Sequence, residues 1–498
     1  MNKKRKIIIV GAGPGGLAAG MILAHNNFEV KIYEREDKVG GRNRSINING
    51  YTFDTGPTFF MMKFIYDQLF EMIGRKSEDY LKFTKIDPMY RLNFSNNRVF
   101  DSTTNLEDMA DQIEKTFPGE SKGLMRFKEK ERKRYQKLYK CLEKDYTHWW
   151  DFLRPQFIEA LPILGIGKSL FSNLGNYFKP ELIRLIFTFQ SKYLGMSPWE
   201  CPAGFTIIPY IEHEFGIYHV EGGLNQTSMA MANVFNEEGG NIKFSTEVKR
   251  LIIENRKVLG VELSNGEKDF ADEVIINADF AYSMTHLIEK GELKKYSKKK
   301  LDEKKYSCST FMIYLGIDKI YDLPHHNIYF ADDYRGNIED VFNRKEISKD
   351  FSFYVQNASI VDKTLAPKGK STLYFLIPVP NNFSAIKWNE EKEKFKKMYL
   401  DGVINRMGIT DLKEHIEVEK IITPSDWESE YNVYKGATFN LAHNLQQMLY
   451  FRPRNKFEEL NNCYLVGGGT HPGSGLPTIY ESGKISAKLI IEKYKKRD

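Results

Sequence analysis

The fold of this chain is decided by the stretch KIIIVGAGPGGL, residues 6–17. Five residues suited to a buried strand lead directly into the pattern Gly-x-Gly-x-x-Gly. Gly11 permits a tight turn from strand to helix, Gly13 lets the backbone approach a pyrophosphate, and Gly16 lets the helix pack closely on the strand. The stretch therefore predicts a phosphate-binding turn.

The following residues complete a nucleotide-binding unit. Leu17–Ala24 is expected to be a helix rich in small residues, and Val30–Tyr33 a second strand that ends on Glu34. The N-terminus of such a helix presents free N–H groups and a positive dipole end to phosphates. Glu34 is placed to accept a hydrogen bond from a ribose hydroxyl. Strand, helix and acid together predict dinucleotide binding, whereas the glycines alone could form an ordinary turn.

A competing interpretation of the N-terminus is a secretory signal, because the basic residues Lys3, Lys4, Arg5 and Lys6 precede an apolar run. Five glycines and a proline within residues 11–20 interrupt that run, and no convincing cleavage site follows it. We therefore expect a cytoplasmic, unprocessed chain.

Composition narrows the class of protein further. The 498 residues, 41% hydrophobic and 28% charged, suit a folded protein of two or three structural units. The net charge of +6 is spread over 72 basic and 66 acidic residues, which does not suggest nucleic acid but is compatible with an anionic membrane surface. The four cysteines lack metal-binding spacing, so we expect no structural zinc, no disulfide framework and a reducing compartment. No apolar run is long enough to predict a transmembrane helix.

A second turn lies close to the first. Gly40-Gly41-Arg42 offers a flexible loop and a fixed charge, and a strand-like segment then leads into Asp54-Thr55-Gly56-Pro57. Gly-Gly-Arg followed by Phe-Asp-x-Gly-Pro resembles the superfamily of flavin-binding amine oxidases and carotenoid desaturases. The resemblance implies that the dinucleotide is FAD, that Gly41 and Arg42 line its diphosphate and flavin side, and that Gly15, Arg35, Gly56 and Pro57 also contact it.

The C-terminal stretch YLVGGGTHPGSGLP, residues 464–477, is the second decisive signature. A buried strand runs into a glycine-rich turn, and the predicted helix Ile479–Tyr494 directs its N-terminus at the ligand, where it favours negative charge on a reduced flavin. The stretch is similar to the last segment of the carotenoid-desaturase family at every fixed position. That resemblance implies cofactor contacts from Gly468, Gly469, Leu476 and Pro477.

Shorter resemblances cover almost the whole chain. They are YLGID at 314–318, LPHH at 323–326, GNIEDVF at 336–342, DKTLAP at 362–367 and FRP at 451–453. Together they resemble the bacterial and fungal type of phytoene desaturase and the related dehydrosqualene (diapophytoene) desaturases.

The expected fold is α/β: an FAD-binding Rossmann-like unit of the two-dinucleotide-binding-domain type, an antiparallel-sheet substrate domain and a mostly helical, membrane-facing subdomain. The FAD-binding unit is expected in three parts, residues 1–75, 206–300 and 431–498, with the helical subdomain at 76–205 and the substrate domain at 301–430. Short strands between 241 and 277, with a hairpin turn at Asn265-Gly266, belong to the second part. By resemblance, the backbone of Val248 reads the adenine edge, and Ala278-Asp279 marks the return to the flavin.

Residues 60–200 are expected to be mostly helical. Apolar residues three or four apart predict an amphipathic helix over Gly123–Asp145, whose basic face is more simply a solvated surface than a binding patch. Residues 149–171, rich in tryptophan and aliphatic side chains, are too short and interrupted to span a bilayer. They could pack as buried helix or lie in a membrane interface, and a bilayer-dwelling substrate favours the interface.

The resemblance implies an FAD-dependent desaturase that introduces conjugated double bonds into a linear polyisoprenoid, by hydride transfer to the flavin and loss of a neighbouring proton. Such a substrate has no polar handle, so recognition depends on apolar area. The expected partners are this hydrocarbon and a membrane surface, to which the chain attaches peripherally. Alternatives on the same fold are a carotenoid isomerase, saturase or terminal oxidase, and a non-catalytic prenyl-binding escort protein.

No residue is convincing as a general base. His471 can titrate near neutrality but is surrounded by loop glycines and prolines. Glu212, His213, Glu214 and His219 cluster in sequence, and a structural role is the default for each. The sequence leaves open the substrate's length (C30 or C40), the number of desaturation steps, the electron acceptor and the oligomeric state.

Overall fold

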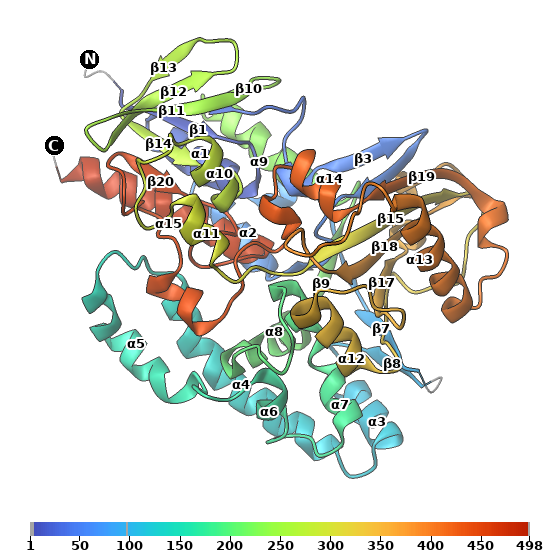
Figure 1. Cartoon of the computed structure of the whole chain (residues 1–498). Coiled ribbons are helices and arrows are strands. Elements are labelled where there is room, and N and C mark those ends of the chain that lie inside the picture. Colours follow the sequence, from blue (N-terminus) through green and yellow to red (C-terminus); the bar gives the residue numbers. More distant parts are fainter. Residues whose placement is uncertain (1–3, 96–97, 497–498) are drawn as a thin grey trace.

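The computed structural model describes residues 4–95 and 98–496. A five-stranded parallel sheet forms the nucleotide-binding unit at one end of the molecule (Figure 1). Its strands, in spatial order, are β10 (Asn241–Lys243), β2 (Glu29–Tyr33), β1 (Lys6–Val10), β14 (Glu273–Ile276) and β20 (Cys463–Leu465). Three distant segments of the chain thus build one sheet.

Three helices pack against this sheet and against one another: α1 (Pro14–His25), α9 (Asn225–Glu237) and α15 (Leu476–Lys495). Every residue of α1 from Pro14 to Ala24 is buried, which is why its sequence is apolar or small all round. A Cβ at Gly483 of α15 would lie 2.5 Å from the carbonyl oxygen of Gly15. The small residues of α1 and α15 therefore let the two helices approach closely.

An antiparallel meander extends beyond the parallel sheet. It consists of β11 (Val248–Glu254), β12 (Lys257–Leu263) and β13 (Lys268–Phe270). Asn265-Gly266 lies in the turn between β12 and β13, where the sequence predicts a hairpin. Helices α10 (Phe280–His286) and α11 (Lys298–Asp302) follow β14.

The second large sheet has seven strands and is antiparallel except where β16 pairs with β7. Its order is β19 (Ile416–Ile422), β15 (Ser309–Ile317), β18 (Ser371–Val379), β17 (Phe353–Gln356), β16 (His326–Tyr329), β7 (Tyr90–Asn93) and β8 (Val99–Ser102). Strands β15, β16, β17 and β18 lie within residues 301–430, where the sequence predicts an antiparallel sheet.

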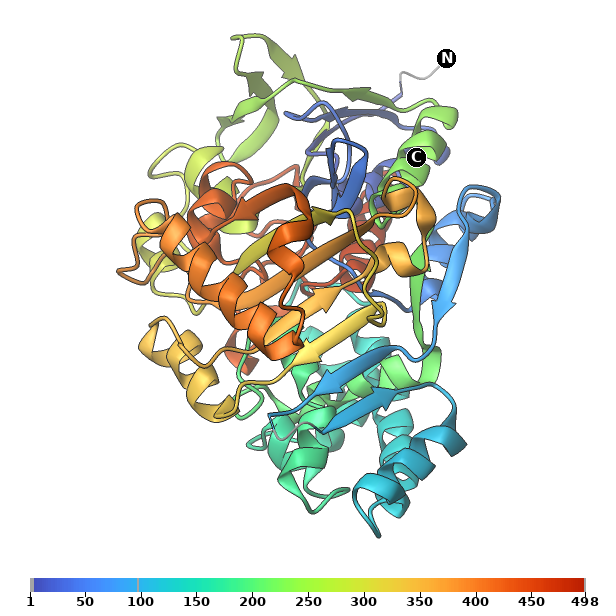
Figure 2. The same cartoon turned by 90° about the vertical axis from the view of Figure 1, so that its right-hand side faces the viewer.

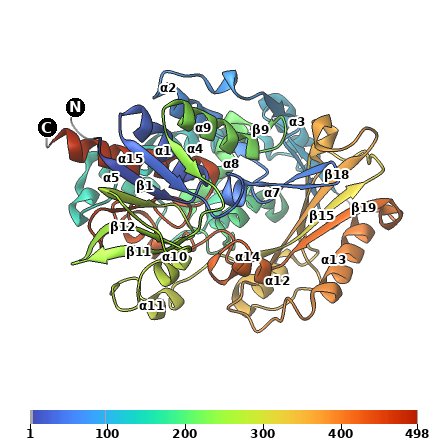
Figure 3. The ribbon, with the colours of Figure 1, turned by 90° about the horizontal axis from the view of Figure 1, so that it is seen from above.

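The two faces of this sheet have different neighbours because side chains alternate along each strand. On β15, Phe311, Ile313 and Leu315 pack in a core with Phe395 and Tyr399 of α13 (Lys392–Met407). Figure 3 shows α13 on the side of the sheet away from the nucleotide-binding unit. The alternate side chains of β15 and β18 consequently face toward that unit.

Helices fill the remaining layer, below both sheets in Figures 1 and 2. They are α3 (Leu106–Thr116), α4 (Ser121–Leu142), α5 (Pro155–Ala160), α6 (Leu170–Leu174), α7 (Glu181–Ile186) and α8 (Ile207–Phe215). Helix α4 agrees with the predicted amphipathic helix, with Leu124, Phe127 and Leu138 buried. None of the helices in the described ranges is both long enough and apolar enough to cross a membrane.

The expectation of a mostly helical segment over residues 60–200 is wrong for residues 83–102. Here β6 (Phe83–Ile86), β7 and β8 are strands, and β7 and β8 extend the seven-stranded sheet. These strands are four residues long, too short for periodicity to show, and β7 pairs with β16, more than 200 residues later. The boundary placed at residue 76 remains a prediction.

Smaller elements connect the layers. They are the strand pair β3 (Ser45–Ile48) and β4 (Tyr51–Asp54), the strands β5 (Phe60–Met61) and β9 (Ile217–Val220), and the helices α2 (Lys63–Glu71), α12 (Tyr334–Glu339) and α14 (Pro424–Ser429). Strand β9 pairs with both β5 and β6 in a third sheet.

Candidate functional site

One continuous cavity of about 620 Å³ runs between the parallel sheet and the inner face of the antiparallel sheet. Its polar part is lined by the glycine turn after β1 and by loops of the C-terminal segment. Its apolar part is lined by inward side chains of the large sheet, among them Met312, Tyr374 and Leu376. The cavity thus joins a nucleotide-type site to an apolar chamber.

The turn after β1 has the geometry that its glycines predict. Gly11 has φ +97°, and a Cβ there would lie 2.6 Å from the carbonyl oxygen of Asn277. A Cβ at Gly16 would lie 2.6 Å from the carbonyl oxygen of Gly11, so this glycine permits close packing of helix on strand. Gly13 lines the cavity as the N-cap of α1, and no side chain caps the helix. Its first turn therefore keeps backbone donors for an anion.

The predicted glycines do not all face the ligand space. Gly11 and Gly13 line the cavity, whereas Gly15 and Gly16 lie outside its lining, against Asn277. Asn277 donates from Nδ2 to the carbonyl oxygens of Gly11 and Gly13 at 2.8 and 3.2 Å. No motif marks this brace, and Asn277 is recognisable only as the residue directly after β14.

Glu34 lines the cavity at the end of β2. Its Oε2 accepts from the backbone N–H of Ala12 at 2.7 Å, and its Oε1 accepts from that of Glu36 at 3.0 Å. Burial raises the pKa of Glu34, and these two hydrogen bonds oppose the rise. Each carboxylate oxygen retains a lone pair, so the group can still accept a ribose hydroxyl.

Arg35 and Val248 line the cavity near Glu34. The backbone N–H of Thr246 donates to the carbonyl oxygen of Glu34 at 2.8 Å, which ties the start of β11 to the end of β2. Arg35 donates to the carbonyl oxygen of Glu430 and lies 3.1 Å from Glu36 Oε1. The structure therefore brings the residues expected at the adenosine end together.

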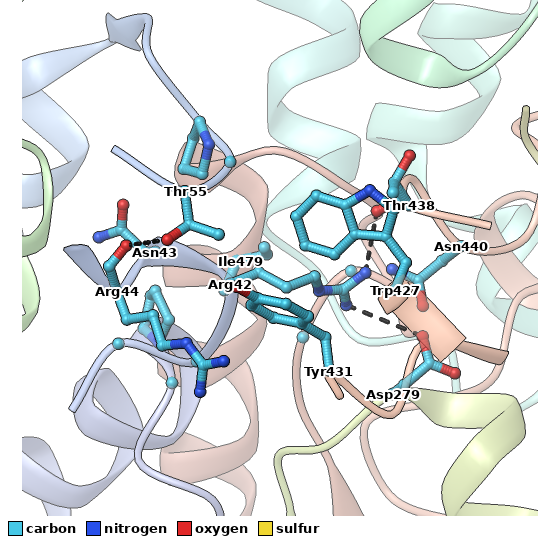
Figure 4. A pocket seen from close by; sticks show the side chains of 18 of the residues that line it. Arg42, Asn43, Arg44, Thr55, Asp279, Trp427, Tyr431, Thr438, Asn440 and Ile479 are labelled. Atoms are coloured by element: carbon cyan, nitrogen blue, oxygen red, sulfur yellow. Dashed lines mark hydrogen bonds and ion pairs between the residues drawn. The ribbon is translucent and has the colours of Figure 1, made fainter. Parts of the chain in front are cut away.

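Arg42 connects three segments of the chain at the middle of the cavity (Figure 4). Its Nη1 donates to the carbonyl oxygen of Thr438 at 2.9 Å, and its Nη2 lies 3.9 Å from Asp279 Oδ2. With its amide nitrogen toward Asp279, Asn440 donates to Asp279 Oδ2 at 2.7 Å and accepts from Arg42 Nη2 at 3.1 Å. Burial raises the pKa of Asp279, against the nearby guanidinium of Arg42.

Gly56 and Pro57, which are predicted to contact the cofactor, also line the cavity. A Cβ at Gly56 would lie 2.8 Å from the carbonyl oxygen of Arg42, so only glycine fits there. The hydroxyl of Tyr374 donates to the carbonyl oxygen of Gly56 at 2.8 Å. This contact ties the predicted flavin side of the cavity to the antiparallel sheet.

The C-terminal signature contributes Gly468, Leu476 and Pro477 to the lining. Gly469, expected at the cofactor, lies outside the lining and faces Phe280, whose Cβ would be 2.5 Å from a Cβ at this position. The buried guanidinium of Arg452, from the Phe-Arg-Pro motif, braces the loop by donating to the carbonyl oxygens of Gly468, at 2.6 Å, and of Thr470, at 3.2 Å.

All five acids and bases weighed from the sequence lie outside the cavity lining. His471 Nε2 contacts the carbonyl oxygen of Lys144 at 2.8 Å, and burial lowers its pKa to about 4. Glu212 accepts from Gln190 at 2.7 Å, and burial raises its pKa to about 8.

The two residues after Glu212 also have structural partners. His213 contacts the carbonyl oxygen of Thr103 at 3.1 Å, and Glu214 pairs with Lys128 at 3.1 Å. These positions fit the structural role that is the default for each residue.

Sequence reasoning missed Lys192, which lines the cavity. Its Nζ lies 4.9 Å from the ring centroid of Tyr334, and burial lowers its pKa to about 7. No local motif marks this residue. Within residues 4–95 and 98–496, no group of His, Cys, Asp and Glu side chains is arranged to hold a metal ion.

The polar groups that line the cavity fit a dinucleotide. An uncapped helix N-terminus supplies backbone N–H groups beside Gly13, Glu34 can accept hydrogen bonds, and Arg42 supplies a cation farther along the cavity. The apolar side chains beyond them fit a hydrocarbon rather than a polar substrate.

Comparisons with known proteins agree with this arrangement. The sequence pattern of the flavin-containing amine oxidoreductases matches residues 14–491. A 4,4'-diapophytoene desaturase (4,4'-diapolycopene-forming) from Methylomonas sp. is 56% identical over 497 residues, which are 100% of this chain and 97% of the relative. An all-trans-zeta-carotene desaturase from Myxococcus xanthus is 34% identical, over 98% of this chain and 93% of that protein. A 4,4'-diapophytoene desaturase (4,4'-diaponeurosporene-forming) from Staphylococcus haemolyticus is 34% identical, over 98% of each.

Solved structures share the fold at low identity. An oxidoreductase from Methanosarcina mazei superimposes with a TM-score of 0.63 at 17% identity, covering 98% of this chain and 100% of that one. A putrescine oxidase bound to putrescine gives a TM-score of 0.59 at 15% identity, covering 98% and 99%.

Proposed function

Because this chain belongs to the flavin-containing amine oxidoreductase family, and to the carotenoid desaturases within it, we propose that its substrate is the C30 hydrocarbon 4,4'-diapophytoene. The chain is an FAD-dependent oxidoreductase that desaturates a linear polyisoprenoid in carotenoid biosynthesis. The observation that carries the choice of substrate is the 56% identity, over the whole chain, to a desaturase of that compound. That relative forms 4,4'-diapolycopene, so we further propose desaturation as far as this product.

The cofactor-binding residues are assigned in the same proposal. The N-terminus of α1 at Gly13 holds the diphosphate, Glu34 holds the adenosine ribose with Val248 at the adenine, and Arg42 and Pro57 lie toward the flavin. Their common lining of one cavity supports this assignment. When bound there, FAD would supply the oxidant for the desaturation, as an acceptor of hydride.

The protein's own contribution is to hold the hydrocarbon and exclude water. Met312, Tyr374 and Leu376 present the inward face of the sheet to the substrate. An apolar substrate gains about 25 cal/mol for each Å² of apolar surface that it buries against such side chains. Binding therefore depends on contact area along the chamber rather than on hydrogen bonds.

The substrate assignment is tested by incubating FAD-loaded protein in liposomes with 4,4'-diapophytoene or with phytoene, followed by chromatography of the products. We expect faster conversion of the C30 compound, with 4,4'-diapolycopene as the final product. Equal or faster conversion of phytoene would contradict the C30 assignment. An isomerised or oxygenated product would contradict desaturation itself.

We also propose that the protein attaches to a membrane surface through an apolar patch on the helical layer. The patch comprises exposed side chains from the turn Trp149–Leu153, helix α5, the segment after it and a C-terminal loop: Trp149, Trp150, Leu153, Ile158, Leu161, Ile166 and Phe451. Trp149, Leu153 and Ile166 are each more than 60% exposed. Helix α5 lies at the periphery of the molecule (Figure 1).

Two further features support contact of the patch with a membrane rather than exposure to solvent alone. The ring of Phe152 lies 6.1 Å from that of Phe451, so the helical layer and the C-terminal loop are in contact there. Lys144 and Lys168 are exposed in the same segment, where they suit anionic headgroups. A substrate that resides in the bilayer also requires an enzyme at its surface.

The test measures how tightly a variant protein binds anionic vesicles in a flotation assay. The variant carries Trp149→Ser, Leu153→Ser and Ile166→Ser. We expect its vesicle affinity to fall about a thousandfold, because each of the three side chains loses roughly 1.5 kcal/mol of burial in lipid. The matched control carries Phe244→Ser, Phe270→Ser and Ile320→Ser, which are exposed apolar residues outside the patch. Unchanged binding by the patch variant, or equal loss by the control, would refute this attachment.

A further inference from the structure

A chain of polar side chains leads from the cavity into the protein and toward its surface. All members except Tyr354, which borders the cavity, are buried. We call it the histidine chain, and from the cavity outward its members are Thr58, Tyr354, His326, His325, His219 and Asp362. The desaturase reaction described above uses none of them.

The inner end of the histidine chain opens on the substrate chamber. Tyr354 and Thr58 both line the cavity. The hydroxyl of Tyr354 lies 2.6 Å from His326 Nδ1 and 3.0 Å from Thr58 Oγ1. The ring of Phe59 stacks on His326 with centroids 4.2 Å apart and fixes the imidazole plane. A hydrogen-bonding hydroxyl is therefore presented to a chamber that is lined mostly by apolar side chains.

The outer end terminates on a carboxylate. His325 Nε2 lies 3.3 Å from His219 Nδ1, and His219 Nε2 lies 2.9 Å from Asp362 Oδ2. Burial alone would raise the pKa of Asp362, but hydrogen bonds from His219, Thr364 and the N–H of Gly222 lower it below its usual value. The carboxylate is thus ionised, and it lies between the exposed residues 361 and 363.

The chain has one gap, between His326 and His325. With neutral rings, and with the Tyr354 hydroxyl proton turned from Thr58 Oγ1 to His326 Nδ1, Tyr354 donates to His326, His325 Nε2–H donates to His219 Nδ1, and His219 Nε2–H donates to Asp362. This arrangement leaves a spare N–H at His326 Nε2 and a bare nitrogen at His325 Nδ1. Both atoms are buried, and neither has a hydrogen-bond partner among the residues described.

The two rings lie with their centroids 4.1 Å apart. The gap therefore separates a donor from a matching acceptor on adjacent rings, and one bridging water can close such a gap.

The chemistry of the substrate requires an outlet for a proton. When a saturated bond is desaturated, one carbon gives up a hydride and its neighbour gives up a proton. An unpaired charge left in an apolar chamber is strongly unfavourable. Of the residues weighed from the sequence as acids or bases, Glu212, His213 and His471 lie outside the cavity lining.

We propose that the histidine chain conducts this proton from Tyr354 at the substrate to His219 beside Asp362. The neighbouring C–H bond breaks, its electron pair forms the new C=C bond, and its proton binds the Tyr354 oxygen. The phenolic proton passes to His326 Nδ1, and the Nε2 proton of His326 passes to His325 Nδ1. The Nε2 proton of His325 then reaches His219 Nδ1, where the imidazolium pairs with Asp362.

Burial supports the direction of transfer. It lowers the pKa values of His325 and His326 well below the usual range, so neither ring retains the proton. The carboxylates that face His219 are Asp362, in contact with it, and Asp54, which is buried nearby and accepts from the N–H of Leu224 at 2.7 Å. The positive charge is therefore most stable at the outer end of the chain.

The test compares Tyr354→Phe with Tyr329→Phe. Tyr329 lies on β16 next to the histidine chain, is buried and does not line the cavity, so its variant is a matched control. Reduction of the bound flavin by 4,4'-diapophytoene is followed in H₂O and D₂O. We expect Tyr354→Phe to be slower by about a hundredfold or more, the usual contribution of a positioned proton acceptor. We also expect the wild type to react more slowly in D₂O than in H₂O, and Tyr354→Phe to lose this solvent isotope effect while its FAD content and substrate affinity stay unchanged.

A second measurement does not depend on activity. Side-chain ¹⁵N spectra of histidine-labelled protein report which ring nitrogen carries the proton. We expect Tyr354→Phe to shift the His326 signals and Tyr329→Phe to leave them unchanged. His219→Gln supplies a second variant at the outer end, with the same expected loss of rate and isotope effect.

The proposal rests on the desaturase reaction, and the experiment separates the two. If the wild type does not reduce its flavin with the substrate, the reaction itself is wrong. If the wild type reacts but Tyr354→Phe and His219→Gln keep its rate and isotope effect, the relay is refuted and the chain is structural.

Discussion

The substitutions Leu376→Ala and Ile377→Ala change neighbouring residues of β18. We expect the first to weaken substrate binding and the second to lower the stability of the protein. Leu376 lines the cavity, whereas Ile377 is fully buried in the core shared with α13. Both substitutions remove three carbon atoms, so they differ only in the face of β18 that they change. The alternation of side chains along β18 therefore predicts opposite phenotypes.

The magnitudes follow from the two environments. Ile377→Ala leaves a void in a closed core and is expected to lower the free energy of unfolding by about 2–5 kcal/mol, with little effect on substrate binding. Leu376→Ala removes apolar contact with the substrate at about 0.8 kcal/mol per carbon, roughly 2 kcal/mol in all. The KM for substrate should then rise about 30-fold, with a much smaller change in stability.

The assay measures initial rates against the mole fraction of 4,4'-diapophytoene in liposomes, together with thermal unfolding of the FAD-loaded protein. An unchanged KM for Leu376→Ala would show that the substrate does not contact this face of the sheet. A raised KM for Ile377→Ala at native stability would show that the two faces have been assigned the wrong way round.

Three further predictions concern charged groups. Arg42→Gln should weaken FAD binding about 10- to 100-fold in fluorescence titrations, because a charge-assisted contact worth about 1.5–3 kcal/mol is lost, while Arg250→Gln in the exposed meander should have no effect. Wild-type stability should fall as pH rises through the range from about 4.5 to 8, because Glu212 is buried as the neutral acid with a pKa of about 8. Denaturant titrations of Glu212→Gln should lack that component, and an identical pH profile would contradict it. Substrate affinity should improve as pH rises through about 7, since Lys192, with its pKa lowered to about 7, loses its charge beside the hydrocarbon. Lys192→Met should bind substrate independently of pH over this range.

The nucleotide-binding unit could be predicted because its signals are local. The glycine turn, the strand before it and the acid after it lie within 30 residues, and each glycine has a steric reason visible in the structure. The long strands β15 and β18 were also predictable, because both of their faces are apolar. One face packs on α13 and the other lines the cavity, so the two sequences are continuous hydrophobic runs.

Other parts of the site depend on contacts between distant segments. Thr438 and Asn440 meet Arg42 across almost 400 residues, and no motif marks either of them. Lys192 resembles any surface lysine until the helical layer places it at the cavity. Gly469 shows the converse, since its motif predicted a cofactor contact and the structure places it against Phe280. Local patterns therefore identified the loops but not which of their atoms face the cavity.

The register of the large sheet connects binding of the hydrocarbon to loss of its proton. Tyr354 on β17 pairs directly with Leu376 on β18, so the two side chains point to the same face and lie side by side. The adjacent pair, Val355 and Phe375, points to the opposite face, into the core with α13. A slip of one residue in the register between β17 and β18 would turn the side chains of the slipped strand to the opposite face of the sheet. The apolar contact that holds the substrate and the hydroxyl that receives its proton are thus fixed together by a single strand pairing. Mutations that disturb this pairing should lower substrate affinity and the rate of flavin reduction together, whereas Tyr354→Phe should lower the rate alone.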